Sequence, residues 1–167
     1  NQGIEISERT SWSCLHGVAR WIIHCGCHTG GHHYWRQHWR APLRQALDWL
    51  QCRVDAIFTD LGQDLFKDLW QTRDLYINIR LNKSDIDSFL AEQSGRALEK
   101  TEKDVALNLL ELQRHSMLMY TSCGWFFNDI SVIETEQILL YAGRTIQLAE
   151  ELTGNSLETH FLMLLAL

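Results

Sequence analysis

The spacing of apolar residues between positions 43 and 57 constrains the fold more than any other feature of this chain. These residues follow one another at intervals of three and four: Leu43, Leu47, Leu50, Val54 and Ile57. Residues at such intervals share one face of an α-helix, so the segment predicts an amphipathic helix with one buried face. Pro42 suits the first turn because no N–H donor is needed there, and Gly62 is typical of a helix end.

Similar signals recur along the chain, and nearly everything from residue 12 onward is predicted to be helical. Hydroxyl residues stand three positions before carboxylates in three places, as is typical of helix N-termini: Ser84 with Asp87, Thr101 with Asp104, and Ser131 with Glu134. The helix after Ser131 should end near Gly154, and Asn155 or Ser156 would cap a last helix. The pattern predicts an all-α, bundle-like fold of about six helices.

Residues 1–167 are expected to form one single helical domain, since no linker rich in Gly, Ser or Pro divides them. The alternating residues Gly3–Ile6 suggest at most a short N-terminal strand. The final apolar run, Phe161–Leu167, has neither a polar end nor a C-cap. We therefore expect a fragment of a larger protein, not a complete enzyme by itself, with residues 1–10 as the connection from a preceding domain.

Charge and hydropathy exclude two classes of partner. The chain has 15 basic and 21 acidic residues, a net charge of −6, and no stripe rich in Lys or Arg. Such a chain is not expected to bind nucleic acid. No apolar run approaches the ~20 residues that cross a bilayer, and no export signal is visible, so no membrane partner is expected. Five cysteines without a disulfide spacing pattern favour reduced thiols and a cytoplasmic location.

Two segments carry residues suited to chemistry, and the first is rich in cysteine and histidine. Cys14, Cys25 and Cys27 lie close together in the sequence, and Cys123 could join them from a distant segment. Four such ligands suffice for a closed zinc site or for an iron–sulfur cluster. The Cys25-x-Cys27 spacing requires a loop, which Gly26 permits. The alternative is that the cysteines pack as small apolar residues and the histidines are exposed.

The second segment, Tyr120–Asp129, combines small polar residues, three adjacent aromatics, an amide and a carboxylate. Aromatic faces beside short polar groups can hold sugar rings, and the alternative is a buried turn whose aromatics belong to the core. The chain has no Gly-rich phosphate loop and no Gly-x-Ser-x-Gly motif. No residue is assigned as catalytic, although a pair such as Cys14 with His16 is a further alternative for a nucleophile and its base.

Both segments resemble the DUF3536 domain, and the resemblance covers about residues 4–165. The first group of motifs comprises Thr10-Ser11-Trp12-Ser13-Cys14-x-His16-Gly17-Val18, Cys25-Gly26-Cys27 with Gly30-Gly31, and Trp39-Arg40-Ala41-Pro42-Leu43. The second comprises Gln113-Arg114-His115, Thr121-Ser122-Cys123-Gly124-Trp125-Phe126-Phe127, Ile133-Glu134-Thr135 and Tyr141-Ala142. The chain departs from the pattern at Val132, where a Gly is expected, and at His32-His33, which replace a Gly/Pro-type loop.

The resemblance implies that the domain follows a catalytic barrel of glycoside hydrolase family 57, whose members act on α-glucans with a Glu nucleophile and an Asp acid/base. That barrel would lie upstream, so neither catalytic carboxylate is assigned to this chain. The implied role is a helical accessory domain that packs on the barrel and contributes to binding of an α-glucan or other polysaccharide. The residues implied to face the barrel or the glucan are Trp12, His16, Arg114, His115, Trp125 and Asp129.

Two other functions stay open beside this interpretation, which itself needs no cofactor. One is a structural module with zinc or an iron–sulfur cluster bound by Cys14, Cys25, Cys27 and Cys123. The other is a plain protein-interaction domain whose motifs merely pack together. Contact in space between the two motif-bearing segments would favour the accessory domain or the metal module over the plain interaction domain.

Overall fold

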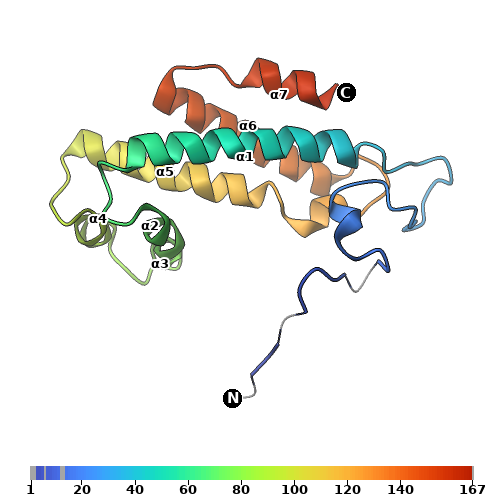
Figure 1. Cartoon of the computed structure of the whole chain (residues 1–167), viewed down its shortest axis with the longest axis horizontal. Helices are drawn as coiled ribbons and strands as arrows, with labels where there is room; N and C mark the ends of the chain where they lie inside the picture. Colours follow the sequence, from blue (N-terminus) through green and yellow to red (C-terminus); the bar gives the residue numbers. More distant parts are fainter. Residues whose placement is uncertain (1–2, 6, 12–13, 167) are drawn as a thin grey trace.

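The computed structural model describes residues 3–5, 7–11 and 14–166, and every regular element within them is a helix (Figure 1). In chain order the elements are η1 (Gly17–Trp21), α1 (Arg40–Gly62), α2 (Leu69–Leu75), α3 (Ile77–Arg80), α4 (Ile86–Ser94), α5 (Lys100–Leu118), η2 (Ser122–Trp125), α6 (Ile133–Thr153) and α7 (Glu158–Leu165). The predicted all-α fold is confirmed. Residues 3–5 of the predicted short strand form no strand, and Ile6 lies outside the described residues.

Four of the helices form the main bundle. α1, α5 and α6 lie side by side, and α7 packs on α1 (Figure 1). The predicted stripe of α1 supplies one wall of the core, with Ile57 partly buried and four residues fully buried: Leu43, Leu47, Leu50 and Val54. α6 supplies another wall with Ile138, Ala142, Thr145, Leu148 and Ala149. Because each large apolar side chain contributes about 1.5–3 kcal/mol on full burial, these stripes hold the bundle together.

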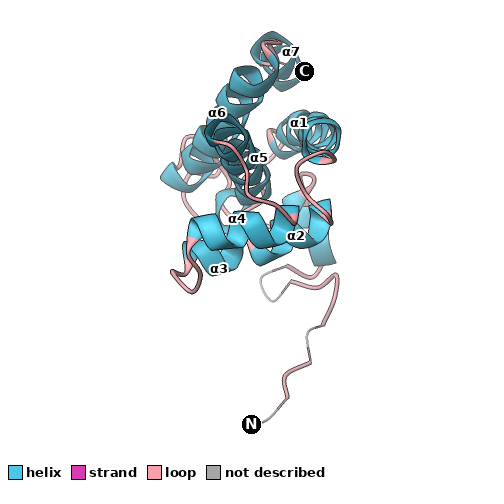
Figure 2. Cartoon of the chain, turned by 90° about the vertical axis from the view of Figure 1, so that its left-hand side faces the viewer, coloured by secondary structure: helices cyan, strands magenta, loops and turns pink. Residues whose placement is uncertain are grey.

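A second core closes one end of the bundle. The short helices α2, α3 and α4 form a layer beneath the long helices, at the end of α1 that contains Gly62 (Figures 1 and 2). Its buried residues are apolar or aromatic: Phe58, Phe66, Tyr76, Phe89, Leu90, Leu98, Ala106, Leu109 and Leu110. The hydroxyl of Tyr76 donates a hydrogen bond to Glu111 (2.6 Å), so its polar group is satisfied at the edge of this core.

The helices end at or just before the predicted glycines, but they do not begin at the predicted hydroxyl residues. α1 ends at Gly62, and Gly154 follows α6 in a left-handed conformation (φ 69°). α4 and α5 begin one residue after carboxylates that cap them, Asp85 and Glu99, in place of the neighbouring hydroxyl residues. The capping box predicted at Ser131 is not formed, because its hydroxyl donates to Asp129 (2.6 Å).

The start of α7 also differs from the prediction that Asn155 or Ser156 caps it. The carboxylate of Glu150, near the end of α6, accepts a hydrogen bond from the backbone N–H of Leu157 (2.9 Å). This bond lowers the pKa of Glu150 below its ordinary value. A contact between two helices therefore takes the place of a local cap.

The prediction that nearly everything from residue 12 onward is helical is wrong for residues 22–39. This stretch is an irregular loop between η1 and α1. Gly26, Gly30 and Gly31 adopt left-handed conformations (φ 80°, 95° and 83°), which interrupt any helix. The loop lies at the end of the bundle where α1 and α6 begin, opposite the second core (Figure 1).

The helices were compared with the requirements for a membrane-spanning segment. Within the described part of the chain, none of them combines the length and the apolar character needed to cross a bilayer.

Candidate metal centre

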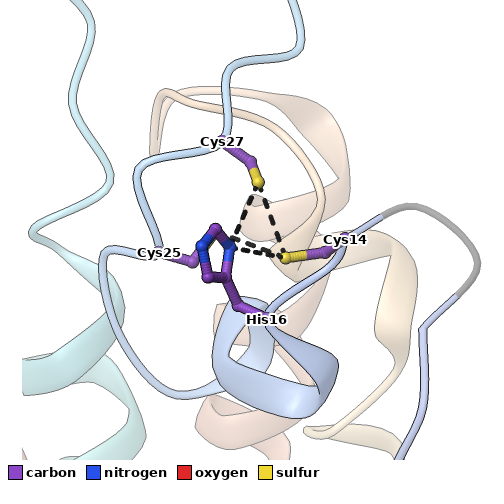
Figure 3. A group of neighbouring side chains, drawn as sticks. All are labelled: Cys14, His16, Cys25 and Cys27. Atoms are coloured by element: carbon purple, nitrogen blue, oxygen red, sulfur yellow. Dashed lines mark hydrogen bonds between the residues drawn. The ribbon is translucent and has the colours of Figure 1, made fainter.

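The structure brings four soft ligands together at the loop end of the bundle. Cys14 and His16 precede η1, whereas Cys25 and Cys27 lie in the loop that follows it. The four side chains gather at one place (Figure 3), and their ligand atoms all lie within 4.8 Å of one another. The Sγ of Cys14 is 3.8 Å from that of Cys25 and 3.6 Å from that of Cys27. The Nδ1 of His16 is 3.5 Å from the Sγ of Cys14 and 3.4 Å from that of Cys27. All three cysteines are free thiols.

These four separations are close to the lengths of tetrahedron edges around one zinc ion. Zinc binds sulfur at about 2.3 Å and imidazole nitrogen at about 2.0–2.1 Å, so tetrahedral ligands lie about 3.8 Å apart for two sulfurs and about 3.5 Å apart for sulfur and nitrogen. A cluster with two irons divides its protein ligands between two metal ions and needs a wider arrangement. The compact group therefore fits a single ion better than a cluster.

Glycine makes this grouping possible at two positions. Side chains two residues apart point in different directions on a helix and lie about 7 Å apart on a strand, so a bend between Cys25 and Cys27 helps them to serve one ion. Gly26 supplies it with φ 80°, a conformation that other residues rarely adopt. Gly17, with φ 61°, follows His16 directly, and a Cβ there would lie 3.2 Å from the backbone oxygen of Arg9.

A buried arginine that forms no ion pair with a carboxylate of the described residues lies next to the sulfurs. Arg40, the first residue of α1, has 0% exposure and directs Nη1 at the Sγ of Cys25 (3.8 Å). Its other hydrogen bonds go to neutral groups, the side-chain oxygen of Gln37 (2.8 Å) and the carbonyls of Phe126 (3.1 Å) and Phe127 (3.0 Å). Burial lowers the pKa of Arg40, and Cys25 raises it in part. A buried cation requires a nearby counter-charge, and thiolates would supply it.

The electrostatics of the sulfurs agree with this arrangement. Burial raises the pKa of Cys25, but the backbone of Cys27, the neighbouring thiols and Arg40 lower it to below its ordinary value of 9.0. The pKa of Cys27 is raised, chiefly by its hydrogen bond with Cys14. Of these two thiols, Cys25, whose Sγ lies 3.8 Å from Nη1 of Arg40, loses its proton more readily.

A buried amide network fastens the loop to the segment between η2 and α6. Gln37 donates to the side-chain oxygen of Asn128 (2.6 Å) and also to the carbonyl of Cys27. The side chain of Asn128 in turn donates to the carbonyl of Gly30 (2.9 Å), and the backbone carbonyl of Asn128 accepts from the indole of Trp39 (3.2 Å). The two motif-bearing segments of the sequence thus meet in space, although they are about 90 residues apart in the chain.

The structure gathers three of the four predicted metal ligands and adds His16, which was predicted to face a glucan. Cys123 is not part of the group. Its side chain is exposed on η2, where it lines a small hollow of about 230 Å³ with Glu134 and Tyr141. The fourth position near the sulfurs is therefore occupied by an imidazole nitrogen.

The other residues predicted to bind glucan lie in separate places. Trp12 is outside the described residues. Trp125 has 0% exposure and stacks on Trp39 (ring centroids 6.0 Å apart), so its ring has no free face for a sugar. Asp129 is partly exposed and accepts hydrogen bonds from Ser131. Neither Trp125 nor Asp129 belongs to the ligand group.

Arg114 and His115 lie on α5, in contact with one carboxylate. The Nη1 of Arg114 is 3.0 Å from Glu111, and the Nε2 of His115 is 3.6 Å from it. Burial lowers the pKa of His115. Both side chains therefore belong to an ion-pair group on α5 rather than to the group of sulfurs.

Sequence reasoning missed Arg40, Gln37 and Asn128 as components of the site. All three are polar residues with at most 1% exposure. Their burial depends on contacts between distant segments, and neither composition nor periodicity signals it. The nearest signal in the sequence is the position of Gln37 and Arg40 directly after the Cys/His loop.

Comparison with known proteins gives a result at the level of the family. Neither the curated proteins nor the solved structures contain a match to this chain. The model of a domain of unknown function, DUF3536, matches residues 35–167, which include α1 to α7 and η2 but not the four grouped ligands. Because this match covers well over half of the sequence, the chain belongs to the DUF3536 family.

Proposed function

We propose that this chain contains a structural zinc site that holds residues 14–27 together as a unit, which the buried Arg40 and Asn128 dock on the helical bundle. One observation carries the proposal: the ligand atoms of Cys14, His16, Cys25 and Cys27 lie within 4.8 Å of one another. Four protein ligands complete the coordination of zinc and leave no position for a reacting water, which is the pattern of structural rather than catalytic sites.

Charge balance supports a metal over a group of neutral thiols. Three thiolates and one Zn²⁺ carry a net charge of −1, which matches the positive charge of the buried Arg40. Arg20 is also buried and stacks on the ring of Phe126 (4.8 Å). Among the described residues neither arginine forms an ion pair with a carboxylate. The charge of −1 offsets one of these two cations, whereas neutral thiols would offset neither.

Elemental analysis of the purified protein, paired with a count of reactive thiols, tests the proposal. We expect one zinc per chain and two reactive thiols, from the exposed Cys52 and Cys123. Cys25→Ser should lose the zinc, whereas the matched variant Cys123→Ser should retain it. Absence of metal with five reactive thiols would overturn the proposal, and iron with inorganic sulfide would replace zinc by a cluster.

We further propose, as a second candidate, the accessory role beside a family 57 barrel that the sequence resemblance implies. It is supported by the outer face of α6, where Ile133 is 74% exposed and Leu140 is 66% exposed. These residues are seven apart, so they share one helical face that a docked domain would cover. The hollow lined by Cys123 and Glu134 lies beside this face.

Binding between this domain and a separately produced family 57 barrel, measured by calorimetry, tests the second candidate. The double variant Ile133→Asp/Leu140→Asp should bind at least tenfold more weakly than the unaltered domain. Leu162→Asp, an exposed apolar position on α7, is the control and should bind normally. Equal binding by all three proteins would show that the face of α6 is not the docking surface.

A further inference from the structure

A pocket of about 690 Å³ lies between α2, α3 and α5, separate from the sulfur ligands. Its volume falls in the range of about 300–1,000 Å³ that is usual for small-molecule sites. Part of its lining is apolar: Ile77, Leu110, Met117 and Leu118. Three arginines line the rest, together with Asp74 and Tyr76: Arg73, Arg80 and Arg114.

Two of the four apolar side chains that line the pocket are exposed. Ile77 is 55% exposed and Met117 is 50% exposed, and they come from different helices that face one another across the pocket. Exposed large apolar side chains that gather in a concave site mark a place where a ligand can gain from burial of its own apolar surface.

The charges in the pocket favour an anion. Glu111 is a shared partner for Arg80 (3.5 Å) and Arg114 (3.0 Å), and it accepts a hydrogen bond from Tyr76 (2.6 Å). Arg73 pairs with its neighbour Asp74 (2.8 Å). Three guanidinium groups therefore face two carboxylates, and one positive charge is left over.

The guanidinium N–H groups of the pocket that have no acceptor also favour an anionic ligand. Each guanidinium has five N–H donors, and the pairs with Glu111 occupy only part of those of Arg80 and Arg114. The carboxylate of Glu111 already accepts from Tyr76 and Arg114, and it has little capacity left for a ligand cation. Donors without acceptors, next to an apolar surface, suit a ligand with one anionic group and an apolar body.

We propose that this pocket binds a small anionic amphiphile. Arg80 and Arg114 hold its anionic group, a carboxylate, sulfonate or phosphate, and its apolar body lies on Ile77 and Met117. A neutral sugar would leave the surplus positive charge unmatched and the apolar side chains exposed, so the pocket is a different site from the glucan surface implied by the sequence resemblance.

A matched pair of fluorescent probes tests the proposal on the purified protein. 8-Anilinonaphthalene-1-sulfonate has an aromatic body with a sulfonate, and N-phenyl-1-naphthylamine has the same body without the charge. We expect saturable binding of the sulfonate at one site and at least tenfold weaker binding of the uncharged probe. Equal affinity for the two probes would overturn the role of the arginines, and absence of saturable binding would overturn the site.

Variants locate the binding within the pocket. Arg80→Gln/Arg114→Gln should weaken the sulfonate probe at least tenfold and leave the uncharged probe unchanged. Arg96→Gln, which removes an arginine paired with Glu102, is a control for the loss of one positive charge outside the pocket. Met117→Glu, at an exposed position that tolerates a polar residue, should also abolish sulfonate binding. Normal binding by Met117→Glu, or an equal loss in Arg96→Gln, would contradict the proposal.

Discussion

The two ends of the helical bundle are closed by opposite kinds of side chain. At the end formed by α2 to α4, aromatic and aliphatic residues such as Phe58, Phe66 and Phe89 are buried against one another. At the other end, an irregular loop covers the bundle through Arg40, Gln37 and Asn128, all buried, and a group of thiols. α1 runs between the two ends and contributes residues to both (Figure 1).

The difference shows how each end gains its stability. Burial of apolar surface is favourable in itself, at roughly 25 cal/mol per Å². Burial of polar groups is favourable only when each of them finds a partner, and a buried charge requires a counter-charge. With the proposed zinc site, the loop end would depend on a bound metal in a way that the end with α2 to α4 does not.

The largest effect is expected at the apolar end, from Phe58→Ala. Phe58 is fully buried and packs on Trp70 (ring centroids 5.3 Å apart), so its removal leaves a cavity. We expect the free energy of unfolding to fall by about 3–5 kcal/mol in denaturant titrations. Zinc content at saturating metal should not change. Loss of zinc in this variant would show that the two ends are one cooperative unit and would contradict the distinction between them.

A smaller effect is expected at the polar end from Arg40→Gln, which keeps a polar side chain but removes the charge. The variant loses hydrogen bonds to two carbonyls and the counter-charge of the thiolates, with an expected cost of about 2–3 kcal/mol. Zinc affinity should fall roughly 10–100-fold, as is typical when a partner of a metal ligand is removed. Competition with a chromophoric chelator measures the zinc affinity, and Arg44→Gln on the same helix is the control. Unchanged affinity would separate the arginine from the metal.

Asn128→Ala should loosen the contact between loop and bundle without removing a ligand. The Asn128 amide accepts a hydrogen bond from Gln37 and donates one to the carbonyl of Gly30. Its loss should lower the free energy of unfolding by about 1–3 kcal/mol. Hydrogen exchange should show faster exchange in residues 28–39 and unchanged exchange in α4 and α5. Asn155→Ala, at an exposed position, serves as the control. Uniformly faster exchange across the whole domain would argue that the loop and the bundle open together.

The smallest effect concerns pH and lies at the edge of the apolar end. Burial raises the pKa of Glu111, but Tyr76 and Arg114 lower it to below its ordinary value of 4.5. A lowered carboxyl pKa stabilises the fold above the unfolded pKa, and this contribution is lost as the pH falls through the folded pKa. Glu111→Gln should therefore flatten the dependence of stability on pH below about 4.5, measured by thermal unfolding. An unchanged slope would contradict the assignment.

The helices could be predicted from the sequence because local chemistry determines them. The stripe from Leu43 to Ile57 and the stops at Gly62 and Gly154 follow from spacing and from backbone freedom. The caps were less predictable, since Asp85 competes with Ser84 for the same N–H groups one residue away. At Ser131 the neighbouring Asp129 takes the hydroxyl, which a three-residue spacing rule does not consider.

The site could be predicted only in part. Three cysteines were found because thiols are rare and chemically specific, and Gly26 indicated that their close spacing was feasible. Cys123 was included on residue type alone, whereas its place on the outer face of η2 is a property of the folded chain. The role of Arg40 could not be predicted, because an arginine at a helix start is usually exposed and its burial depends on Phe126 and Phe127.

The position of the four ligands within residues 14–27 bears on the order in which the chain folds. Closing a loop this short costs little chain entropy, whereas the contacts that dock it, such as Gln37 with Asn128, join segments 91 residues apart. The proposed zinc ion could therefore be bound before any of the long helices has formed. An ion that also binds the unfolded chain adds less to equilibrium stability than its affinity suggests. Such an ion would also act on the folding rate, because the loop would meet the bundle as a preformed unit.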